Sequence, residues 1–257
     1  MLTPGKQLLR VRERDLSNRK IFYFLPNIFT ALNMACGFVA SILAWKSDFY
    51  TACMILLLGS IFDSVDGKVA RFTGTSSSFG EQFDSMSDVI SFGMAPAFLA
   101  YNYYFKPYGR IGIVIPFIFL LCGALRLARF NSNIEKVDSS FFQGLPSPAG
   151  ALGVVGMILF SLEFSILQNR IIFPGILMVV LSILMISNVP FNSFKNSEWV
   201  KKNKKYVLMM ILGSVILTIS YLEVMVGLVI FTYIGMSLFY FFVKRGELKD
   251  VFKWSDP

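Results

Sequence analysis

Long apolar stretches recur along this 257-residue sequence, and short polar or charged segments separate them. A helix needs about 20 apolar residues to cross the hydrocarbon core of a bilayer. Inside that core a helix also satisfies its own backbone hydrogen bonds, which an open strand cannot do. Eight stretches fit, and they are residues 25–45, 51–71, 82–105, 111–130, 148–168, 171–187, 206–222 and 225–243. The sequence therefore predicts an all-α, polytopic membrane bundle of about eight transmembrane helices.

The basic residues lie mostly on one side of the predicted membrane. Of the 24 lysines and arginines, all but Lys46, Lys106, Arg110 and Arg170 fall on the side that also carries both termini. Cytoplasmic loops of membrane proteins carry such an excess of positive charge. We therefore expect a multi-pass protein of the cytoplasmic membrane with both termini in the cytoplasm. The net charge of +8 then reflects topology and attraction to anionic lipids, and no nucleic-acid partner is predicted.

Four aspartates interrupt the second and third apolar stretches. Asp63 and Asp66 are spaced i, i+3, and Asp84 and Asp88 are spaced i, i+4, so each pair shares one face of a helix. A carboxylate inside a membrane costs about 3 kcal/mol or more. Four together also repel one another unless a cation lies between them. We therefore expect a hard divalent metal ion with oxygen ligands, such as Mg²⁺, Mn²⁺ or Ca²⁺.

The connection between the two acidic segments, TGTSSSFG at 73–80, is rich in hydroxyl groups and glycine. Backbone N–H groups and short hydroxyls in such a turn can hold phosphate. Together with Arg71 and a metal ion, this turn predicts a site for a diphosphate. The chain has no histidine, so histidine-based nucleophilic catalysis is excluded and acid–base chemistry must use carboxylates, lysine or tyrosine.

Two arrangements without a diphosphate could also account for the four acids. The carboxylates could form ion pairs with nearby basic residues, namely Lys68, Arg71, Arg126 and Arg129. A divalent-cation transporter is the alternative from a different class of protein. Transporters place such acids near the membrane midplane, in broken helices and internal repeats. Here the acids cluster near one membrane face, and the sequence shows no internal repeat.

The segment from Asp63 to Asp88 resembles the signature D-x2-D-G-x2-A-R-x8-G-x3-D-x3-D of the CDP-alcohol phosphotransferases at every fixed position. The sequence PNIFT at 26–30 resembles the PN-x2-T opening of that family. Two further segments, RLARFN at 126–131 and FFQGLPSPAG at 141–150, resemble its phosphatidylserine synthase branch. The resemblance implies a six-helix catalytic core and a homodimer. The expected division is a basic cytoplasmic arm at 1–23, a transmembrane catalytic domain at 24–243 with its motifs in 24–150, and a cytoplasmic tail at 244–257.

The same resemblance implies a reaction and its residues. A serine hydroxyl would attack CDP-diacylglycerol in line, releasing CMP and forming phosphatidylserine, with two Mg²⁺ or Mn²⁺ ions assisting. Other acceptors on the same machinery, namely glycerol 3-phosphate, inositol phosphate or choline, remain open. By motif position, the expected metal ligands are Asp63, Asp66, Asp84 and Asp88, and Asp88 is also the candidate base. The residues expected to contact the CDP-lipid are Asn27, Thr30, Gly67, Arg71 and Ser77.

The acceptor site is predicted from charge. The carboxylate of serine needs a cation, and Arg126 and Arg129 lie at i, i+3 near the cytoplasmic end of the fourth apolar stretch. They could equally serve as topology determinants or as neighbours of a phosphate. The segment 141–150, which includes Gln143, is expected to close over the acceptor.

Overall fold

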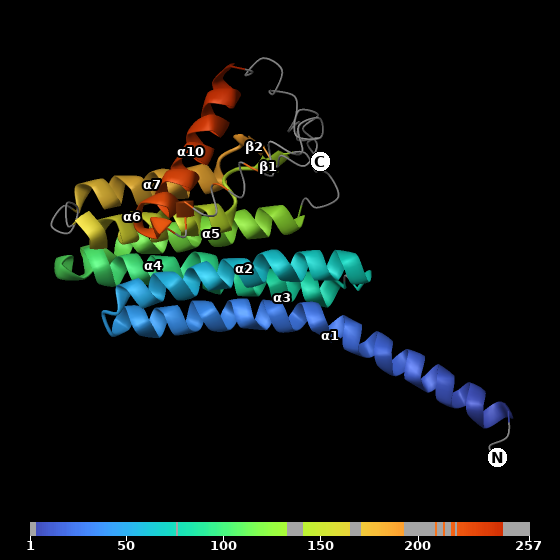
Figure 1. Cartoon of the computed structure of the whole chain (residues 1–257). Coiled ribbons are helices and arrows are strands. Elements are labelled where there is room, and N and C mark those ends of the chain that lie inside the picture. The colour runs from blue at the N-terminus through green and yellow to red at the C-terminus, as the bar shows by residue number, and fades with distance from the viewer. Residues whose placement is uncertain are drawn as a thin grey trace.

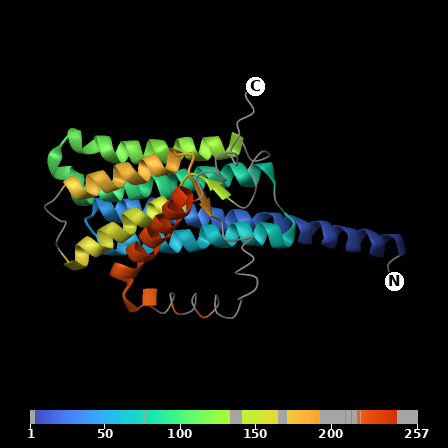
Figure 2. The same ribbon diagram turned by 90° about the horizontal axis from the view of Figure 1, so that it is seen from above.

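The computed structural model describes residues 4–75, 77–132, 141–164, 171–192 and 220–243, together with the single residues 209, 213, 217 and 218. Most of its helices run side by side, while the last one crosses the bundle obliquely (Figures 1 and 2). The α-helices are α1 (Pro4–Trp45), α2 (Phe49–Thr73), α3 (Ser78–Asp88), α4 (Ala95–Ala100), α5 (Val114–Ser132), α6 (Ser147–Phe164), α7 (Ile172–Ile186) and α10 (Leu222–Val243). The structure is therefore the helical bundle that the apolar stretches predict.

Among the described residues, five helical segments are long and apolar enough to cross a bilayer, and α7 is a shorter apolar helix. The five are Leu25–Trp45, Phe49–Thr73, Ile111–Ser132, Ser147–Phe164 and Leu222–Val243. They confirm a multi-pass membrane protein. The predicted stretch 206–222 falls mostly outside the described residues, so the total of eight spans stays a prediction. The predicted tail at 244–257 lies outside them entirely.

The predicted stretch 82–105 is helical throughout but changes from α-helical to π-helical winding twice. After α3, a π-helical segment η1 (Val89–Met94) leads into α4, and a second one, η2 (Tyr101–Phe105), follows it. Single π-helical turns inside α-helices occur frequently at functional sites. Here the first begins immediately after Asp88. The change of winding alters the direction of the side chains that follow, which a regular helical pattern does not predict.

A tight turn joins α2 to α3 and is fixed by both helix ends. Gly74 has a left-handed backbone (φ 63°) at the end of α2, and its N–H bonds to the carbonyl of Ala70. At the start of α3, the Ser77 hydroxyl accepts a hydrogen bond from the Gly80 N–H at 3.1 Å. Glycine after a helix and serine before one are the preferred residues for these positions. The turn thus lays α3 back along α2, and the two acidic pairs face the same space.

Two serines of the third span fasten it to α1. Ser87 donates to the Thr30 carbonyl at 3.0 Å, and Ser91 donates to the Asn33 carbonyl at 2.8 Å. A side chain at Gly37 would meet the Ser91 backbone at 2.8 Å, so glycine permits this close approach. Small residues let membrane helices pack backbone to backbone. These contacts fix α1 beside the acidic segments.

Within the described residues, the structure departs from an all-α bundle at one place. Two three-residue strands, β1 (Phe141–Gln143) and β2 (Pro190–Asn192), pair antiparallel with Phe142 opposite Phe191. They are too short to show an alternating pattern, and their pairing brings together segments far apart in the sequence. Figure 1 shows this ladder toward the same end of the bundle as the α2–α3 turn. At that end α1 also projects beyond the bundle, so at least from Pro4 the predicted arm is a helix continuous with the first span.

Candidate metal centre and nucleotide cleft

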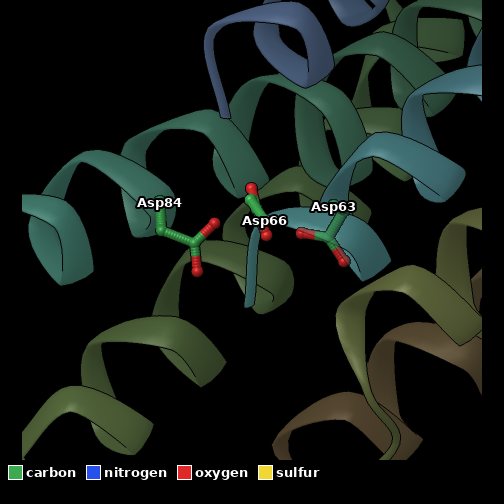
Figure 3. A group of neighbouring side chains, drawn as sticks. All are labelled: Asp63, Asp66 and Asp84. Atoms are coloured by element: carbon green, nitrogen blue, oxygen red, sulfur yellow. The ribbon is translucent and has the colours of Figure 1, made fainter. Parts of the chain in front are cut away.

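Three carboxylates from two helices converge between α2 and α3. Asp63 and Asp66 come from α2 and Asp84 from α3, and one oxygen of each lies within 4.8 Å of the others. Figure 3 shows the three side chains turned toward a common space. The i, i+3 spacing on α2 and the tight turn before α3 produce this arrangement. An all-oxygen donor set of this kind suits Mg²⁺ or Mn²⁺.

Asp88 joins the same group through Asp63, because their carboxyl groups lie within hydrogen-bonding distance of each other. Two carboxylates so close need a shared proton or a cation between them. In addition, the Oδ1 atoms of Asp84 and Asp88 are buried and have no hydrogen-bond partner among the described residues. Buried polar atoms without a partner are costly unless something binds them. The four residues therefore fit a divalent cation, and the orphaned oxygens favour it over simple ion pairing.

A cleft of about 200 Å³ opens beside the carboxylates. All five residues predicted to contact the CDP-lipid line it. The lining residues are Pro26, Asn27, Thr30, Asp66, Gly67, Ala70, Arg71, Thr75, Ser77, Gly80, Glu81 and Asp84. The cleft is thus bounded by α1, α2, α3 and the turn between the last two, with carboxylates on one side and a guanidinium on another.

Thr30 connects the cleft to the carboxylates. Its hydroxyl donates to Asp66 Oδ2 at 2.9 Å, and both side chains are buried. Such a hydrogen bond fixes the orientation of a metal-binding carboxylate. A side chain at Gly67 would come 4.0 Å from both terminal nitrogens of Arg71, so glycine keeps the space beside this guanidinium open.

Five lining residues were not predicted as contacts, namely Pro26, Ala70, Thr75, Gly80 and Glu81. Pro26, Ala70 and Gly80 are fixed positions of the motifs, and Glu81 shares a helical face with Asp84. Thr75 lies in the hydroxyl-rich turn, and its hydroxyl is 2.6 Å from that of Thr73. The sequence shows that Thr75 belongs to this turn, but a Ser/Thr-rich connection does not reveal which of its residues line the cleft.

The two predicted acceptor arginines have different surroundings. Arg126 of α5 is buried, with 7% of its surface exposed, and donates from Nη1 to the Ser147 hydroxyl at 2.8 Å. It also interacts electrostatically with Asp88 and with Tyr233 of α10. Its Nε atom is buried and unpartnered among the described residues. Arg126 therefore interacts electrostatically with one of the four acids and has an unused donor.

Arg129 points instead at the end of α7. Its terminal nitrogens donate to the carbonyls of Ile186 (2.8 Å) and Ser187 (3.1 Å), and to that of Gln143 at 3.2 Å. The Gln143 amide in turn donates to Asn188 Oδ1 at 3.0 Å. Basic side chains stabilise the free carbonyls at a helix carboxyl end. This geometry favours a structural function for Arg129, and the predicted acceptor contacts of Arg129 and Gln143 remain untested.

Together, the helical bundle and its acidic centre define an integral membrane protein with a carboxylate cluster that could hold a cation, beside a cleft. Residues 23–187 match the profile of the CDP-alcohol phosphatidyltransferases. The chain belongs to this family, which confirms the resemblance found in its motifs. The helix α10 lies beyond the matched residues.

Several curated proteins are similar to the chain over most of its length. It is 37% identical over 210 residues to the CDP-diacylglycerol–serine O-phosphatidyltransferase of Helicobacter pylori strain J99, which covers 80% of this chain and 87% of that protein. It is 41% identical over 184 residues to the enzyme of the same name from Methanocaldococcus jannaschii, covering 72% of this chain and 81% of the other. An archaetidylserine synthase of Methanothermobacter thermautotrophicus is 36% identical over 182 residues, covering 68% of this chain and 73% of that protein.

Proposed function

We propose that the protein transfers the phosphatidyl group of CDP-diacylglycerol to L-serine, releasing CMP and forming phosphatidylserine. The observation that carries this proposal is the convergence of the Asp63, Asp66 and Asp84 carboxylates beside a cleft that also holds Arg71. A diphosphate needs both cation-binding acids and a cationic side chain. The relatives named as CDP-diacylglycerol–serine transferases supply the substrates.

Asp63, Asp66, Asp84 and Asp88 would hold Mg²⁺ or Mn²⁺, with room in the donor set for two ions. Bound divalent ions would offset the charge of the diphosphate and polarise the reacting oxygens. Thr30 keeps Asp66 oriented through its hydrogen bond. The orphaned oxygens of Asp84 and Asp88 are the strongest support for this assignment.

The CDP moiety of the donor occupies the cleft in this proposal. Arg71 binds the diphosphate, Gly67 leaves space for it, and the Ser77 hydroxyl lies at the start of α3. Asn27 and Thr30 complete the lining from α1. The acyl chains extend sideways into the bilayer between helices, which explains why the reaction takes place within a membrane bundle.

Asp88 serves as the base. The serine hydroxyl oxygen forms a bond to the phosphorus that carries diacylglycerol, and the bond from that phosphorus to the bridging oxygen breaks. CMP leaves with the electron pair of that bond, and the hydroxyl proton passes to Asp88. Asp88 would also be a metal ligand, and a metal-bound carboxylate is a weak base, so a bound ion would assist the proton transfer by polarising the serine hydroxyl.

Arg126 binds the carboxylate of serine. Arg129 donates its hydrogen bonds to backbone carbonyls, whereas the Nε atom of Arg126 has no partner among the described residues. Arg126 is therefore the better candidate to bind the serine carboxylate. A phosphorylated acceptor such as glycerol 3-phosphate or inositol phosphate would need more cationic side chains than Arg126 alone. Choline carries no carboxylate, so the positive charge of Arg126 would have no anionic partner if choline were the acceptor. The surroundings of Arg126 thus favour serine among the acceptors.

The orientation in the membrane belongs to the same proposal. Eight spans with a six-helix catalytic core would place both termini and the cleft on the cytoplasmic side, and the protein would act as a homodimer. The charge bias of the loops supports this orientation. So does the structure, because the cleft is lined by the α2–α3 turn, and that turn lies at the end of the bundle from which α1 projects (Figure 1).

The test is CMP release by the purified full-length protein in detergent, with CDP-diacylglycerol, Mg²⁺ or Mn²⁺, and each candidate acceptor in turn. We expect release that requires both serine and metal. Asp88→Asn should lower kcat by roughly 100-fold or more, because it removes the base. Asp48→Asn is the matched control, since Asp48 caps α2 and asparagine caps a helix equally well.

Each contrary outcome is informative. Release with a different acceptor would overturn serine while keeping the reaction. No release with any acceptor, from a folded protein that still binds metal, would overturn the transferase and support a divalent-cation transporter.

A further inference from the structure

The amino end of α6 lies against the buried guanidinium of Arg126. Ser147 is the first residue of this 18-residue helix, and its hydroxyl accepts a hydrogen bond from Arg126 Nη1 at 2.8 Å. Only 1% of Ser147 and 7% of Arg126 are exposed. A helix start and a positively charged side chain therefore meet inside the bundle.

Several hydrogen-bond donors at this contact have no acceptor among the described residues. The Nε atom of Arg126 is buried and unpartnered. The Ser147 hydroxyl accepts from Arg126 but donates its own proton to none of these residues. In the first turn of α6, the N–H groups of Ser147 and Ala149 also lack a backbone partner there, whereas Gly150 donates to a carbonyl. The contact thus offers both side-chain and backbone donors to a ligand.

The charges of these groups suit an anion. The amino end of a helix carries a partial positive charge, and Arg126 adds a full one. A buried guanidinium with an unused donor is costly in a membrane bundle unless an anion binds it. Asp88 interacts electrostatically with Arg126, but it belongs to the carboxylate cluster through Asp63. A carboxylate ligand fits because its planar oxygens match the N–H groups of a guanidinium and of a helix end.

The third span connects this contact with the proposed base. Its segment η1 begins immediately after Asp88 and packs against both α5 and α6. Serine is a short molecule, so a carboxylate bound between Arg126 and Ser147 leaves the serine hydroxyl directed toward the acids of the third span.

We propose that Ser147 and the amino end of α6 complete the subsite for the carboxylate of the amino-acid acceptor, which Arg126 binds from α5. This inference rests on the proposed function. Arg126 donates from Nε to one carboxylate oxygen, and the Ser147 hydroxyl donates to the other while it accepts from Nη1. A hydroxyl can accept and donate at the same time. The free N–H groups of the first turn of α6 add their partial positive charge.

The test compares Ser147→Ala with Ser182→Ala in the purified full-length protein. Losing a hydrogen bond to a charged group should raise the KM for serine about tenfold in Ser147→Ala, with the KM for CDP-diacylglycerol unchanged. Ser182 of α7 is the matched control, because it is also completely buried but donates within its own helix, to the Met178 carbonyl at 2.7 Å. Its variant should have the kinetics of the wild type.

Ser147→Cys is a second variant for the case that Ser147→Ala does not fold. Cysteine keeps the shape of the side chain but replaces the hydroxyl with a weak donor. The KM for serine should therefore rise in this variant too, again without a change in the KM for CDP-diacylglycerol.

L-alanine provides a further measurement, because it has the carboxylate and the amine of serine but no hydroxyl to react. As a competitive inhibitor against serine, it should bind about tenfold more weakly to Ser147→Ala than to the wild type. Ethanolamine lacks the carboxylate, so its inhibition constant should be the same for both proteins.

Three outcomes would overturn the inference. An unchanged KM for serine in the Ser147 variants would exclude the contact. An equal rise in the KM values of serine and CDP-diacylglycerol would assign Arg126 and Ser147 to a phosphate of the donor. Equal weakening of alanine and ethanolamine would show that Ser147 does not recognise the carboxylate. Failure of the proposed function looks different, because the wild type itself would then release no CMP in response to serine.

Discussion

Arg126 and Arg129 lie one helical turn apart on α5 and have the same side chain, yet their contacts differ. Arg126 faces Asp88 and Ser147, whereas Arg129 binds the carbonyls that end α7. From charge and spacing alone, both arginines were candidates to bind the serine carboxylate. Arg129 instead contacts carbonyls at the end of α7 and in β1, and these contacts join residues far apart in the sequence. The sequence could therefore predict the pair but not their separate functions.

Exchanging each arginine for lysine should separate these functions. Arg129→Lys should destabilise the protein by about 2 kcal/mol, because one ammonium cannot serve several carbonyls at once. Its Tm in detergent should fall by roughly 5 °C while the KM for serine stays unchanged. Arg126→Lys should instead raise the KM for serine with little change in Tm. A higher KM for serine in Arg129→Lys and a lower Tm in Arg126→Lys would show that Arg129 binds the acceptor and Arg126 is structural.

Gly67 supports a second prediction at this scale. Alanine there should stabilise α2 by about 1 kcal/mol through helix propensity, and a Cβ 4.0 Å from the Arg71 nitrogens is in ordinary contact. The same methyl group occupies space beside the guanidinium, so the KM for CDP-diacylglycerol should rise severalfold. Thermal unfolding and donor titration measure the two effects. Gly235→Ala is the control, because no atom lies within 4 Å of its added Cβ. A decrease in Tm without a change in KM would contradict the assignment of Gly67.

At the scale of elements, α2, its turn and α3 form a hairpin that carries all four acids. Much of this was predictable, because the acid spacings, the glycine at the turn and the serine before α3 are local signals. The π-helical winding of the third span was not predictable from local signals, and neither were the hydrogen bonds of Ser87 and Ser91 to α1, which join residues far apart in the sequence. The β1–β2 ladder was missed for a related reason, because three-residue strands are stabilised by their partners and not by their own pattern.

The hairpin predicts that a divalent cation stabilises the fold as well as supporting activity. A metal ion between α2 and α3 binds only the folded protein, so saturation at about 100 times the Kd should add about 2.7 kcal/mol. Mg²⁺ or Mn²⁺ should therefore raise the Tm of the wild type, and EDTA should reverse the rise. Asp84→Asn should lose most of this increase, while Glu163→Gln at the carboxyl end of α6 should retain it. Equal metal-induced shifts in both variants would place the cation elsewhere.

At the scale of the whole molecule, apolar length predicted the bundle, and the five described long segments confirm it. Hydropathy does not reveal which helices neighbour one another. It therefore did not predict that α10 packs on α6. The acidic centre depends on neighbours in sequence, whereas the proposed acceptor subsite depends on the assembled bundle.

This difference has a consequence for the order in which the protein is made. Contacts between residues near in sequence form early, and those between distant segments wait until the later segments are in place. The capped turn between α2 and α3 lets the carboxylates meet once the first three spans have entered the membrane. The helices α6, α7 and α10 enter the membrane after the first three spans. A nascent chain would thus bring its four acids together before the rest of the bundle is assembled.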